Sequence, residues 1–396
     1  MKPAIGILAY NRPASLRRLL RSIASGVYPD KIHLIISIDF GGEQREKVLE
    51  VADSFEWVHG DKQIIDHRTH IGPKAHFHFV GSLAKEHGSI IRLEDDHFVS
   101  PMFYQYASKA LDFYKDDPRV AGISLYNVWF NGITKEPFIP YLDDGDNYFM
   151  QAPWSHGQAY RASQWESYDA YCRQEVHSAS IKDALHPNWA ALDDEEWIPD
   201  AARFLVETNR YYVFPRESLC TNFGEKGFHF KKSSPFFQVP LQTHRQNFRF
   251  PSLDDSLAVY DVFQEMMPDR MTRLSHHLEG FDFEMDLNGT KARSNIRHPY
   301  VVTSQPCRSS VRTWGLHLFP REANIVAEIP GTELKLCRKE DLRPGGYAGS
   351  LARFHRYEYA QSRLSVGLKR HALFWTIRQA ERMMGWIKSL LSPEKR

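Results

Sequence analysis

The chain has 396 residues, more than a single hydrophobic core usually serves, so we expect one large domain with appendages or two domains. Its formal net charge is +1, which gives no whole-protein reason to expect nucleic acid as a partner. The four cysteines form no CxxC pair, which argues against a zinc knuckle or a disulfide framework and favours a reducing, cytoplasmic compartment. No stretch reaches the roughly 18 to 20 apolar residues that a transmembrane helix needs.

The first hundred residues alternate strand and helix signals. Residues 4–9 form an apolar run of strand length, and apolar residues between 16 and 23 recur at three- and four-residue spacing, which is typical of one helical face. Residues 33–38 predict a second strand, 75–86 a second helix and 89–93 a third strand. This alternation predicts right-handed crossovers and a mostly parallel sheet flanked by helices, and therefore an α/β fold.

Polar residues follow each of these three strands. Asn11 comes after the first, Asp39 after the second, and the third runs into Glu94-Asp95-Asp96. Because ligands of parallel sheets bind beyond the carboxyl ends of the strands, we expect the three clusters to converge at one edge. Adjacent carboxylates raise one another's pKa unless a cation lies beside them, and Mg²⁺ or Mn²⁺ is commonly bound by carboxylates together with substrate phosphates. The triplet therefore predicts a divalent-cation site, with a solvated turn as the alternative.

The order and spacing of these motifs resemble those of a known enzyme family, the GT-A glycosyltransferases of the family 2 type. The resemblance covers about residues 4–245, and its triplet is especially similar to that of N-acetylglucosaminyltransferase I and its relatives. It rests on Ile7-Leu8-Ala9-Tyr10-Asn11-Arg12-Pro13, Asp39, His70-Ile71-Gly72 and Leu93-Glu94-Asp95-Asp96.

The resemblance implies a GT-A fold, in which a Rossmann-like, mostly parallel sheet is flanked by helices. It also implies a metal-dependent, inverting transferase that moves a hexosyl or N-acetylhexosaminyl group from a nucleotide-sugar donor, with a UDP-sugar expected. The acceptor would be a glycan or a lipid-linked sugar, in polysaccharide or glycoconjugate biosynthesis. Mn²⁺ or Mg²⁺ is the implied cofactor.

The resemblance also assigns roles to the residues at the strand ends. It makes Asp96 the metal ligand, places Glu94 and Asp95 nearer the nucleoside, and gives Asp39 a contact with the base or ribose. Asn11-Arg12 would either contact the nucleotide directly or form a turn that caps the following helix.

The segment Thr69-His70-Ile71-Gly72-Pro73-Lys74 matches the loop that lies near the nucleotide in this family, and Gly72 is its best-matched residue. His70 stands where the family usually has Asn, which is a departure. Arg12 and Lys74 could each balance the charge of the diphosphate, or be solvated surface cations.

A segment rich in aromatic residues and glycine, residues 152–160, resembles the stretch that lines the donor-sugar and acceptor site in these enzymes. Aromatic rings such as that of Trp154 suit the apolar faces of sugars, and Gly157 permits close backbone approach. The alternative is a buried aromatic core.

Four acids, Asp193-Asp194-Glu195-Glu196, precede Trp197 in the place where the family keeps its catalytic carboxylate. Inverting transfer needs a base that takes the proton of the acceptor hydroxyl, and we expect Asp194 in this role, with Asp193 second. An acidic helix start is the alternative. His229 is the second metal-ligand candidate, because the family often has a histidine there, although a lone histidine is more often structural.

The pattern changes after residue 245. We expect a transferase domain over 1–245, a helical connector over 246–280, a small β-rich accessory unit over 281–340 and a helical tail over 341–396. Within the accessory unit, an alternating run at 281–287 is followed by Asn288-Gly289, a strong hairpin signal. Further short apolar runs lie at 300–303 and 324–329 and suggest more strands.

The tail combines apolar residues at helical spacing with interspersed lysine and arginine and with Trp375 and Trp386. Such a basic amphipathic helix, over 368–391, suits an anionic membrane surface, so we expect a peripheral contact with the inner face of the membrane. The alternative is a helix packed on the body of the protein.

Two rival functions remain. A sugar-nucleotide nucleotidyltransferase also uses a parallel sheet and a metal, but it normally has a Gly-rich loop with a basic residue after the first strand, and residues 9–13 are not such a loop. The other rival is a non-catalytic glycan-binding protein that retains the fold.

Overall fold

The computed structural model describes residues 2–134, 136–174, 196–225, 233, 235–343 and, in the tail, 372, 375, 376, 379, 380, 383 and 384. The chain divides into two compact units, residues 1–346 and 347–396.

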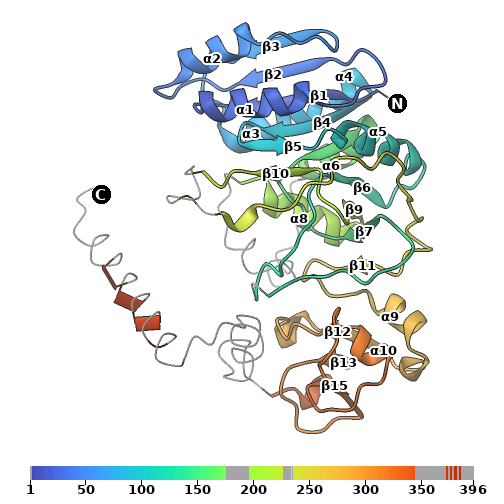
Figure 1. The fold of residues 1–396 in the computed structure, drawn as a ribbon. Helices are drawn as coiled ribbons and strands as arrows, with labels where there is room; N and C mark the ends of the chain where they lie inside the picture. The colour runs from blue at the N-terminus through green and yellow to red at the C-terminus, as the bar shows by residue number, and fades with distance from the viewer. Residues whose placement is uncertain are drawn as a thin grey trace. The chain divides into compact units, whose positions relative to one another are not determined.

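A nine-stranded sheet forms the centre of the first unit (Figure 1). Its strand order is β11-β7-β9-β6-β8-β4-β1-β2-β3. The strands are β1 (Ala4–Ala9), β2 (Leu34–Ile38), β3 (Lys62–Asp66), β4 (Ser89–Glu94), β6 (Val120–Ser124), β7 (Asn147–Met150), β8 (Gln158–Arg161), β9 (Tyr211–Pro215) and β11 (Val259–Tyr260).

The sheet is parallel on one side and mixed on the other. β1, β2, β3 and β4 pair in parallel, whereas β8 runs antiparallel between β4 and β6. β9 is parallel to β6 and antiparallel to β7, and β11 is parallel to β7. The fold is therefore α/β as predicted, and the expectation of a mostly parallel sheet applies best to β1–β4.

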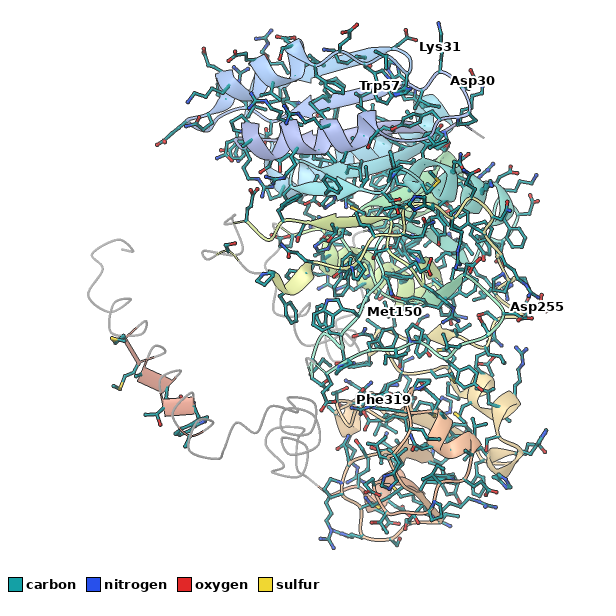
Figure 2. The ribbon with its side chains drawn as sticks, viewed as in Figure 1. Asp30, Lys31, Trp57, Met150, Asp255 and Phe319 are labelled. Carbon is teal, nitrogen blue, oxygen red and sulfur yellow. The ribbon has the colours of Figure 1, made fainter. Side chains whose placement is uncertain are left out.

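Helices cover both faces of this sheet. Successive side chains of a strand point to opposite faces, so alternate residues belong to two separate apolar clusters. In β1, for example, Ile5 and Ile7 belong to one cluster and Ala4 to the other. One cluster contains residues of α1 (Pro13–Ala24), α2 (Arg45–Ser54) and α5 (Phe103–Phe113). The other contains residues of α3 (Gly72–Ser82), α4 (Ala84–His87), α6 (Ala162–Cys172) and α8 (Ile198–Glu207). Figure 2 shows the side chains that fill these layers, with Met150 of β7 completely buried.

The predicted elements of the first hundred residues are confirmed. The three strands are β1, β2 and β4, and the helical pattern at 16–23 belongs to α1, which begins at Pro13, where a missing N–H costs no hydrogen bond. The helix expected over 75–86 is divided into α3 and α4 at Leu83. β3 was not predicted, because its sequence is short and begins with the polar Lys62-Gln63.

The accessory unit predicted over 281–340 is β-rich. Its four-stranded sheet has the order β12-β13-β15-β14. The strands are β12 (Phe283–Asp286), β13 (Tyr300–Thr303), β14 (Arg312–Trp314) and β15 (Leu334–Arg338), and the 3₁₀ turns η4 (Arg293–Asn295) and η5 (Lys339–Asp341) lie beside them.

Two predictions within this unit were wrong. Asn288-Gly289 does form a turn, with the Gly289 N–H donating to the Asp286 carbonyl at 2.9 Å, but β12 and β13 pair in parallel and make no hairpin. The chain passes through η4 before it reaches β13, so the turn only begins a longer crossover. The apolar run at 324–329 forms no strand, since α10 (Ala323–Val326) occupies its start.

The segment predicted as a helical connector, 246–280, contains α9 (Pro268–Leu274) and the 3₁₀ turn η3 (His276–Leu278). It also contains β11, the edge strand of the main sheet. The connector is therefore partly helical and partly a continuation of the sheet.

A buried ion cluster joins this segment to the accessory unit. The Lys291 ammonium lies 2.5 Å from Asp261 Oδ2 and 2.6 Å from Glu284 Oε1, and only 3% of Lys291 is exposed. A buried charge is tolerated when it is paired, and removing one partner is costly because the other charge stays buried. The cluster therefore fixes β12 against the loop that follows β11.

Two further sets of buried polar contacts fix the same junction. The Glu265 carboxyl group, whose pKa burial raises well above its usual value, accepts the N–H groups of Leu287 at 2.9 Å and Asn288 at 2.7 Å. Arg321 pairs with Glu136 and donates to the Leu287 carbonyl at 2.6 Å. These contacts, together with an apolar core shared with the main sheet, make the accessory unit part of the first compact unit.

Glu322 gives a testable pH dependence of stability. Burial raises the pKa of its carboxyl to about 7, against a lowering effect of Arg321. A glutamic acid in an unfolded chain has a pKa of about 4.3, so the folded protein keeps this proton over a pH range in which the unfolded chain has lost it. The stabilisation is complete below the unfolded pKa and is lost as the pH rises through 7.

We expect the free energy of unfolding, measured by urea denaturation, to fall between pH 5 and pH 8 by about 2 kcal/mol more in the wild type than in Glu322→Gln. Glu46→Gln, on the exposed face of α2, is the matched control and should follow the wild type. Parallel pH curves for the wild type and Glu322→Gln would contradict the prediction.

Within the described residues, no helix is both long and apolar enough to cross a bilayer. In the second unit, the seven described residues between 372 and 384 are helical and exposed, and Trp375 is 66% exposed. The remainder of the predicted tail helix lies outside the described residues.

Candidate active site

The polar clusters predicted at the strand ends do meet at one edge of the sheet. β4 carries the triplet at its carboxyl end and pairs with β1, which pairs with β2. The Asp39 N–H donates to the Ala9 carbonyl at 2.9 Å, and the Asp95 N–H donates to the Leu8 carbonyl at 3.0 Å. The backbone therefore holds the ends of β1, β2 and β4 side by side.

Arg12 bridges the two aspartates of the triplet. Its Nη1 donates to Asp96 Oδ2 at 3.0 Å and its Nη2 donates to Asp95 Oδ1. The second Asp95 oxygen accepts the Tyr10 N–H at 3.4 Å. Arg12 is thus not a freely solvated cation, and in this structure it supplies the positive charge that adjacent carboxylates require.

The two aspartates differ in their electrostatics. Burial raises the pKa of Asp95 to about 7, although Arg12 lowers it, and the residue is only 3% exposed. Burial also disfavours the Asp96 carboxylate, but His97 and Arg12 bring the pKa of Asp96 below its usual value. The Asp96 side chain is 21% exposed, so Asp96 is the better placed of the two to hold a cation.

Glu94, Asp96 and His97 offer ligand atoms that all lie within 4.8 Å of one another. The His97 Nδ1 accepts the Glu94 N–H at 3.1 Å, and burial lowers the pKa of His97 to about 4. A neutral ring whose Nδ1 accepts must carry its proton on Nε2, which lies 3.9 Å from Asp96 Oδ1. A protonated nitrogen cannot bind a metal, so Glu94 and Asp96 are the two residues of the group that fit one. Such an oxygen-only pair suits Mg²⁺ or Mn²⁺.

A buried arginine behind the triplet was not predicted. Arg92 is fully buried, and its guanidinium donates to Glu94 Oε1 at 3.1 Å, to the Ser155 carbonyl at 3.3 Å and to Gln158 Oε1 at 2.6 Å. It therefore orients Glu94 and ties the segment around residues 154–158 to β4. A charged residue two positions before Glu94 in an apolar strand shares its face, and this signal could have identified it.

The aromatic segment predicted to line the sugar site lies against the triplet. His156 stacks on His97, with 5.8 Å between the ring centroids, and the Asn222 side-chain amide hydrogen-bonds its Nε2 at 2.9 Å. Asn222 lies opposite His97 in the antiparallel pair of β5 (His97–Val99) and β10 (Cys220–Asn222). Trp154 stacks on Tyr126 at 5.9 Å and is only partly buried.

Gly157 is required by two local constraints. Its φ of +82° is in the left-handed region, which side chains disfavour. A Cβ there would also lie 3.2 Å from the Cβ atoms of Leu125 and Cys220. The close approach at Gly157 is therefore to the side chains of Leu125 and Cys220, within the turn that carries Trp154 and His156.

Three N–H donors in this segment are buried without an acceptor among the described residues: Trp154 Nε1, His156 Nδ1 and Gln158 Nε2. Asn222 Oδ1 accepts the Gly224 N–H at 3.1 Å, so its amide nitrogen faces His156 Nε2, and the proton of the His156 ring must be on Nδ1. Burial lowers the pKa of His156 to about 4, so the ring is neutral at pH 7. Unpaired buried donors call for an explanation, and the oxygen atoms of a ligand would satisfy them.

Asp39 holds the loop that was predicted to lie near the nucleotide. Its carboxylate accepts the N–H groups of Ile71 at 2.9 Å and Gly72 at 3.1 Å, and His70 Nδ1 lies 2.8 Å from it. The rings of Tyr10 and His70 lie 5.5 Å apart, and both side chains are exposed. Asp39 itself is only 3% exposed. Its carboxylate is therefore used mainly to position this loop, and little of it is available to a ligand.

Asn11 does not cap the following helix, and Lys74 is already paired with a carboxylate. The N-cap of α1 is Arg12 and has no side-chain capping hydrogen bond, so Asn11 is not the cap of that helix. The Lys74 ammonium lies 2.7 Å from Asp200 Oδ2 in α8. A contact of Lys74 with a diphosphate would therefore have to compete with this ion pair.

The residues at the end of the acidic run, Glu196 and Trp197, lie near Arg92, the arginine that hydrogen-bonds Glu94. The Trp197 ring stacks on Phe77 with 4.0 Å between centroids, and the Arg92 guanidinium lies over both rings. Glu196 is buried, with 7% exposed. Asp193, Asp194 and His229 lie outside the described residues, so their roles stay predictions.

Comparisons with known proteins give distant likenesses. No protein-family model matches the chain, and no curated protein does. The solved structure of S. aureus TarS 1-349 aligns with 56% of this chain and 60% of its own length, at 13% identity and a TM-score of 0.34. The complex of the same protein with UDP-GlcNAc covers 55% and 60%, at 16% identity and a TM-score of 0.32.

Mannosyltransferase PcManGT from Pyrobaculum calidifontis, in complex with GDP-Man and Mn2+, aligns over 58% of this chain and 59% of its own. Its identity is 11% and its TM-score 0.37. In each case the alignment spans less than two thirds of the other chain.

Proposed function

We propose that the chain is a metal-dependent GT-A glycosyltransferase that moves a sugar from a nucleotide-sugar donor to a glycan or lipid-linked acceptor with inversion. A UDP-sugar is the expected donor. One observation carries the proposal: Glu94 and Asp96 lie together at the carboxyl end of a central strand, beside Arg12 and next to the loop held by Asp39. This is the edge at which open α/β sheets bind nucleotides.

Glu94 and Asp96 would hold the metal, and Mn²⁺ or Mg²⁺ bound there would neutralise a diphosphate and stabilise it as a leaving group. Arg12 already lies 3.0 Å from Asp96, so its guanidinium is close enough to pair with a phosphate bound at the same place. The exposed rings of Tyr10 and His70 offer faces for a nucleobase or ribose beside Asp39.

The sugar would lie against the segment that carries Trp154 and His156. Sugar hydroxyl groups are acceptors as well as donors of hydrogen bonds, and the unpaired N–H groups of Trp154 and His156 need acceptors. The partly buried Trp154 ring also offers an apolar face to a sugar ring.

We assign the base to Asp194, with Asp193 as the second choice. Asp194 lies three residues before Trp197, and the ring of Trp197 packs under the same arginine that orients Glu94. His229 is proposed as an additional metal ligand. A base near the acceptor pocket and a metal at the diphosphate would act on opposite sides of the anomeric carbon, as inversion requires.

The deciding experiment is to incubate the full chain with a panel of nucleotide sugars in Mn²⁺ and in EDTA, and to measure released nucleoside diphosphate. Release that depends on Mn²⁺ is expected for at least one donor. Pyrophosphate release in place of nucleoside diphosphate would favour the nucleotidyltransferase. Binding of glycans without turnover of any donor would favour a glycan-binding protein, and either result would overturn the proposal.

We also propose that residues 368–391 contact an anionic membrane surface at the inner face of the membrane, where a lipid-linked acceptor would reside. The exposed Trp375, Met383 and Met384 support this, because interfacial helices present apolar and indole side chains to lipid. Flotation with anionic liposomes should recover the full chain, and truncation before Lys369 should abolish recovery. Equal flotation of the full and truncated chains would rule the helix out, and neutral liposomes test the electrostatic part.

A further inference from the structure

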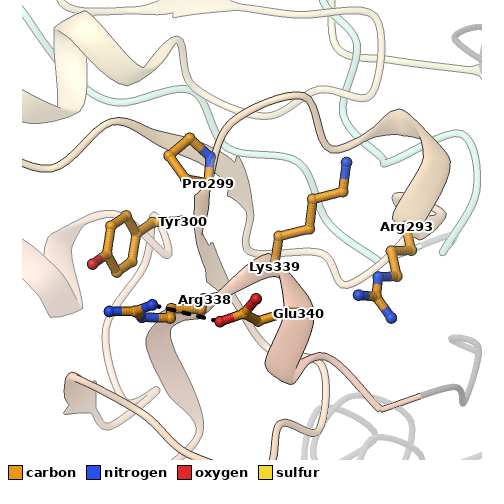
Figure 3. Close-up of a pocket in the computed structure, with 6 residues that line it drawn as sticks. All are labelled: Arg293, Pro299, Tyr300, Arg338, Lys339 and Glu340. Carbon is orange, nitrogen blue, oxygen red and sulfur yellow. Dashed lines mark ion pairs between the residues drawn. The ribbon is translucent and has the colours of Figure 1, made fainter.

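A depression on the accessory unit lies outside the residues of the candidate active site (Figure 3). Its volume is about 340 Å³, which is at the small end of the range for ligand sites. It is formed where the start of β13 meets the end of β15, between the turns η4 and η5. The residues that line it are Arg293, Pro299, Tyr300, Arg338, Lys339 and Glu340.

The lining of this depression is predominantly basic. It contains three cationic side chains and one carboxylate, and the pair between Arg338 Nη1 and Glu340 Oε1 is long, at 3.5 Å, and exposed. An exposed pair of this kind contributes little and can rearrange easily. Arg293 is exposed and forms no ion pair with any described residue. The depression therefore has positive charge that no described residue neutralises.

Two of the lining residues lie on paired strands, which fixes the positions of their backbones. Tyr300 of β13 pairs directly with Arg338 of β15, and the Lys339 N–H donates to the Pro299 carbonyl at 2.9 Å. The Lys339 ammonium is held by the Ile296 carbonyl. Sites on regular elements hold a ligand more accurately than sites on loops.

An aromatic ring lies among these cations. The Tyr300 ring packs edge to face on Phe281 at 5.2 Å, and the Arg338 guanidinium lies 5.9 Å from its centroid. A ring suits the apolar face of a sugar, and guanidinium groups suit phosphate or carboxylate. Single-stranded nucleic acid is recognised by successive aromatic platforms, whereas this depression has one ring.

We propose that this depression binds an anionic saccharide, that is, a sugar that bears a phosphate or a carboxylate. Arg338, which lies beside the Tyr300 ring, contacts the anion, Tyr300 contacts the sugar ring, and Arg293 adds positive charge at the other end of the lining (Figure 3). The buried ion pairs that fix the accessory unit to the main sheet also fix the position of this depression relative to the candidate active site. The depression would therefore be a second binding site for an acidic acceptor glycan. This acceptor role rests on the proposed function, whereas the binding itself does not.

The test is calorimetry on the full chain without nucleotide or metal, with glucose 6-phosphate, glucuronate, glucose and inorganic phosphate as probes. Glucose 6-phosphate and glucuronate should bind, and the affinity should fall with added salt because the site is exposed. Glucose should bind at least about tenfold more weakly, and so should inorganic phosphate, because each lacks one of the two contacts. Binding of glucose as tight as that of glucose 6-phosphate would overturn the anion part, and equally tight inorganic phosphate would overturn the saccharide part.

Three variants locate the site. Arg293→Ala with Arg338→Ala should weaken glucose 6-phosphate at least about tenfold, the effect of losing roughly 1.4 kcal/mol of binding free energy. Arg312→Ala, an exposed arginine of β14 outside the depression, is the matched control and should bind as the wild type does. Tyr300→Ala should weaken glucose 6-phosphate but not inorganic phosphate. Unchanged binding in the double variant would overturn the proposal.

The acceptor role has a separate readout. The double variant should release nucleoside diphosphate by hydrolysis of the donor at the wild-type rate, and should need a higher concentration of an acidic acceptor for half-maximal transfer. An unchanged acceptor requirement would overturn the acceptor role while leaving the saccharide site intact. If neither the wild type nor any variant turns over a donor but the wild type still binds glucose 6-phosphate, the proposed glycosyltransferase activity is wrong and the saccharide site stands.

Discussion

Asp96→Asn should remove the dependence of nucleotide binding on a divalent metal. Asp96 is the more exposed of the two aspartates of the triplet and remains ionised next to Arg12, so a cation at this edge would depend on it. Two unit charges about 4 Å apart near a protein surface interact by roughly 4 kcal/mol, so losing this one should weaken metal-dependent binding by about 10²-fold or more. Asparagine keeps the shape and can still accept a hydrogen bond from Arg12.

Calorimetry with UDP and with other nucleoside diphosphates, in Mn²⁺ and in EDTA, measures the effect. The wild type should bind more tightly in Mn²⁺, and Asp96→Asn should bind equally weakly in both. Asp53→Asn, exposed on α2, is the matched control and should behave as the wild type. A nucleotide that the wild type binds equally well with and without metal would refute the metal role.

His97 makes the same experiment more specific. Its Nδ1 accepts the Glu94 N–H, so Nε2 carries the proton and faces Asp96 as a donor. His97→Asn keeps a side chain that can accept and donate, and should therefore keep a clear difference between Mn²⁺ and EDTA. Loss of the metal response equal to that of Asp96→Asn would make His97 a ligand and would contradict the assigned tautomer.

The sequence was sufficient to predict the scaffold of the site because that scaffold consists of local apolar runs. β1 and β2 are almost wholly apolar and buried, β4 contains the buried apolar residues Ile90, Ile91 and Leu93, and the polar residues that follow these strands mark the edge of the sheet. Long-range pairing was not readable in the same way. The run after β12 has the residues of a hairpin turn, yet β13 pairs in parallel, because the partner of a strand depends on the crossover between them and not on the turn alone.

Within the site, charges could be predicted but their pairing could not. Arg12 was open to two interpretations, and only the geometry shows that it bridges Asp95 and Asp96. The protonated nitrogen of His97 follows from a backbone N–H that no sequence pattern reveals. Arg92 was the exception, since a lone charge within an apolar strand is a signal that sequence reasoning could have used.

Asp194→Asn should lower the turnover rate by roughly 10² to 10⁴-fold, the range for losing a general base. The base takes the proton of the acceptor hydroxyl, so donor affinity should hardly change, and steady-state transfer together with UDP calorimetry separates the two effects. Asp193→Asn and Glu195→Gln are the matched variants, because each removes a neighbouring carboxylate of the same acidic run. Glu196 is the poorest candidate, since its side chain is buried beside Trp197.

Near-normal turnover in Asp194→Asn with a loss in Asp193→Asn or Glu195→Gln would move the base along the chain. Full activity in all three variants would mean that no carboxylate of this run removes the proton, and the inverting mechanism would have to be given up.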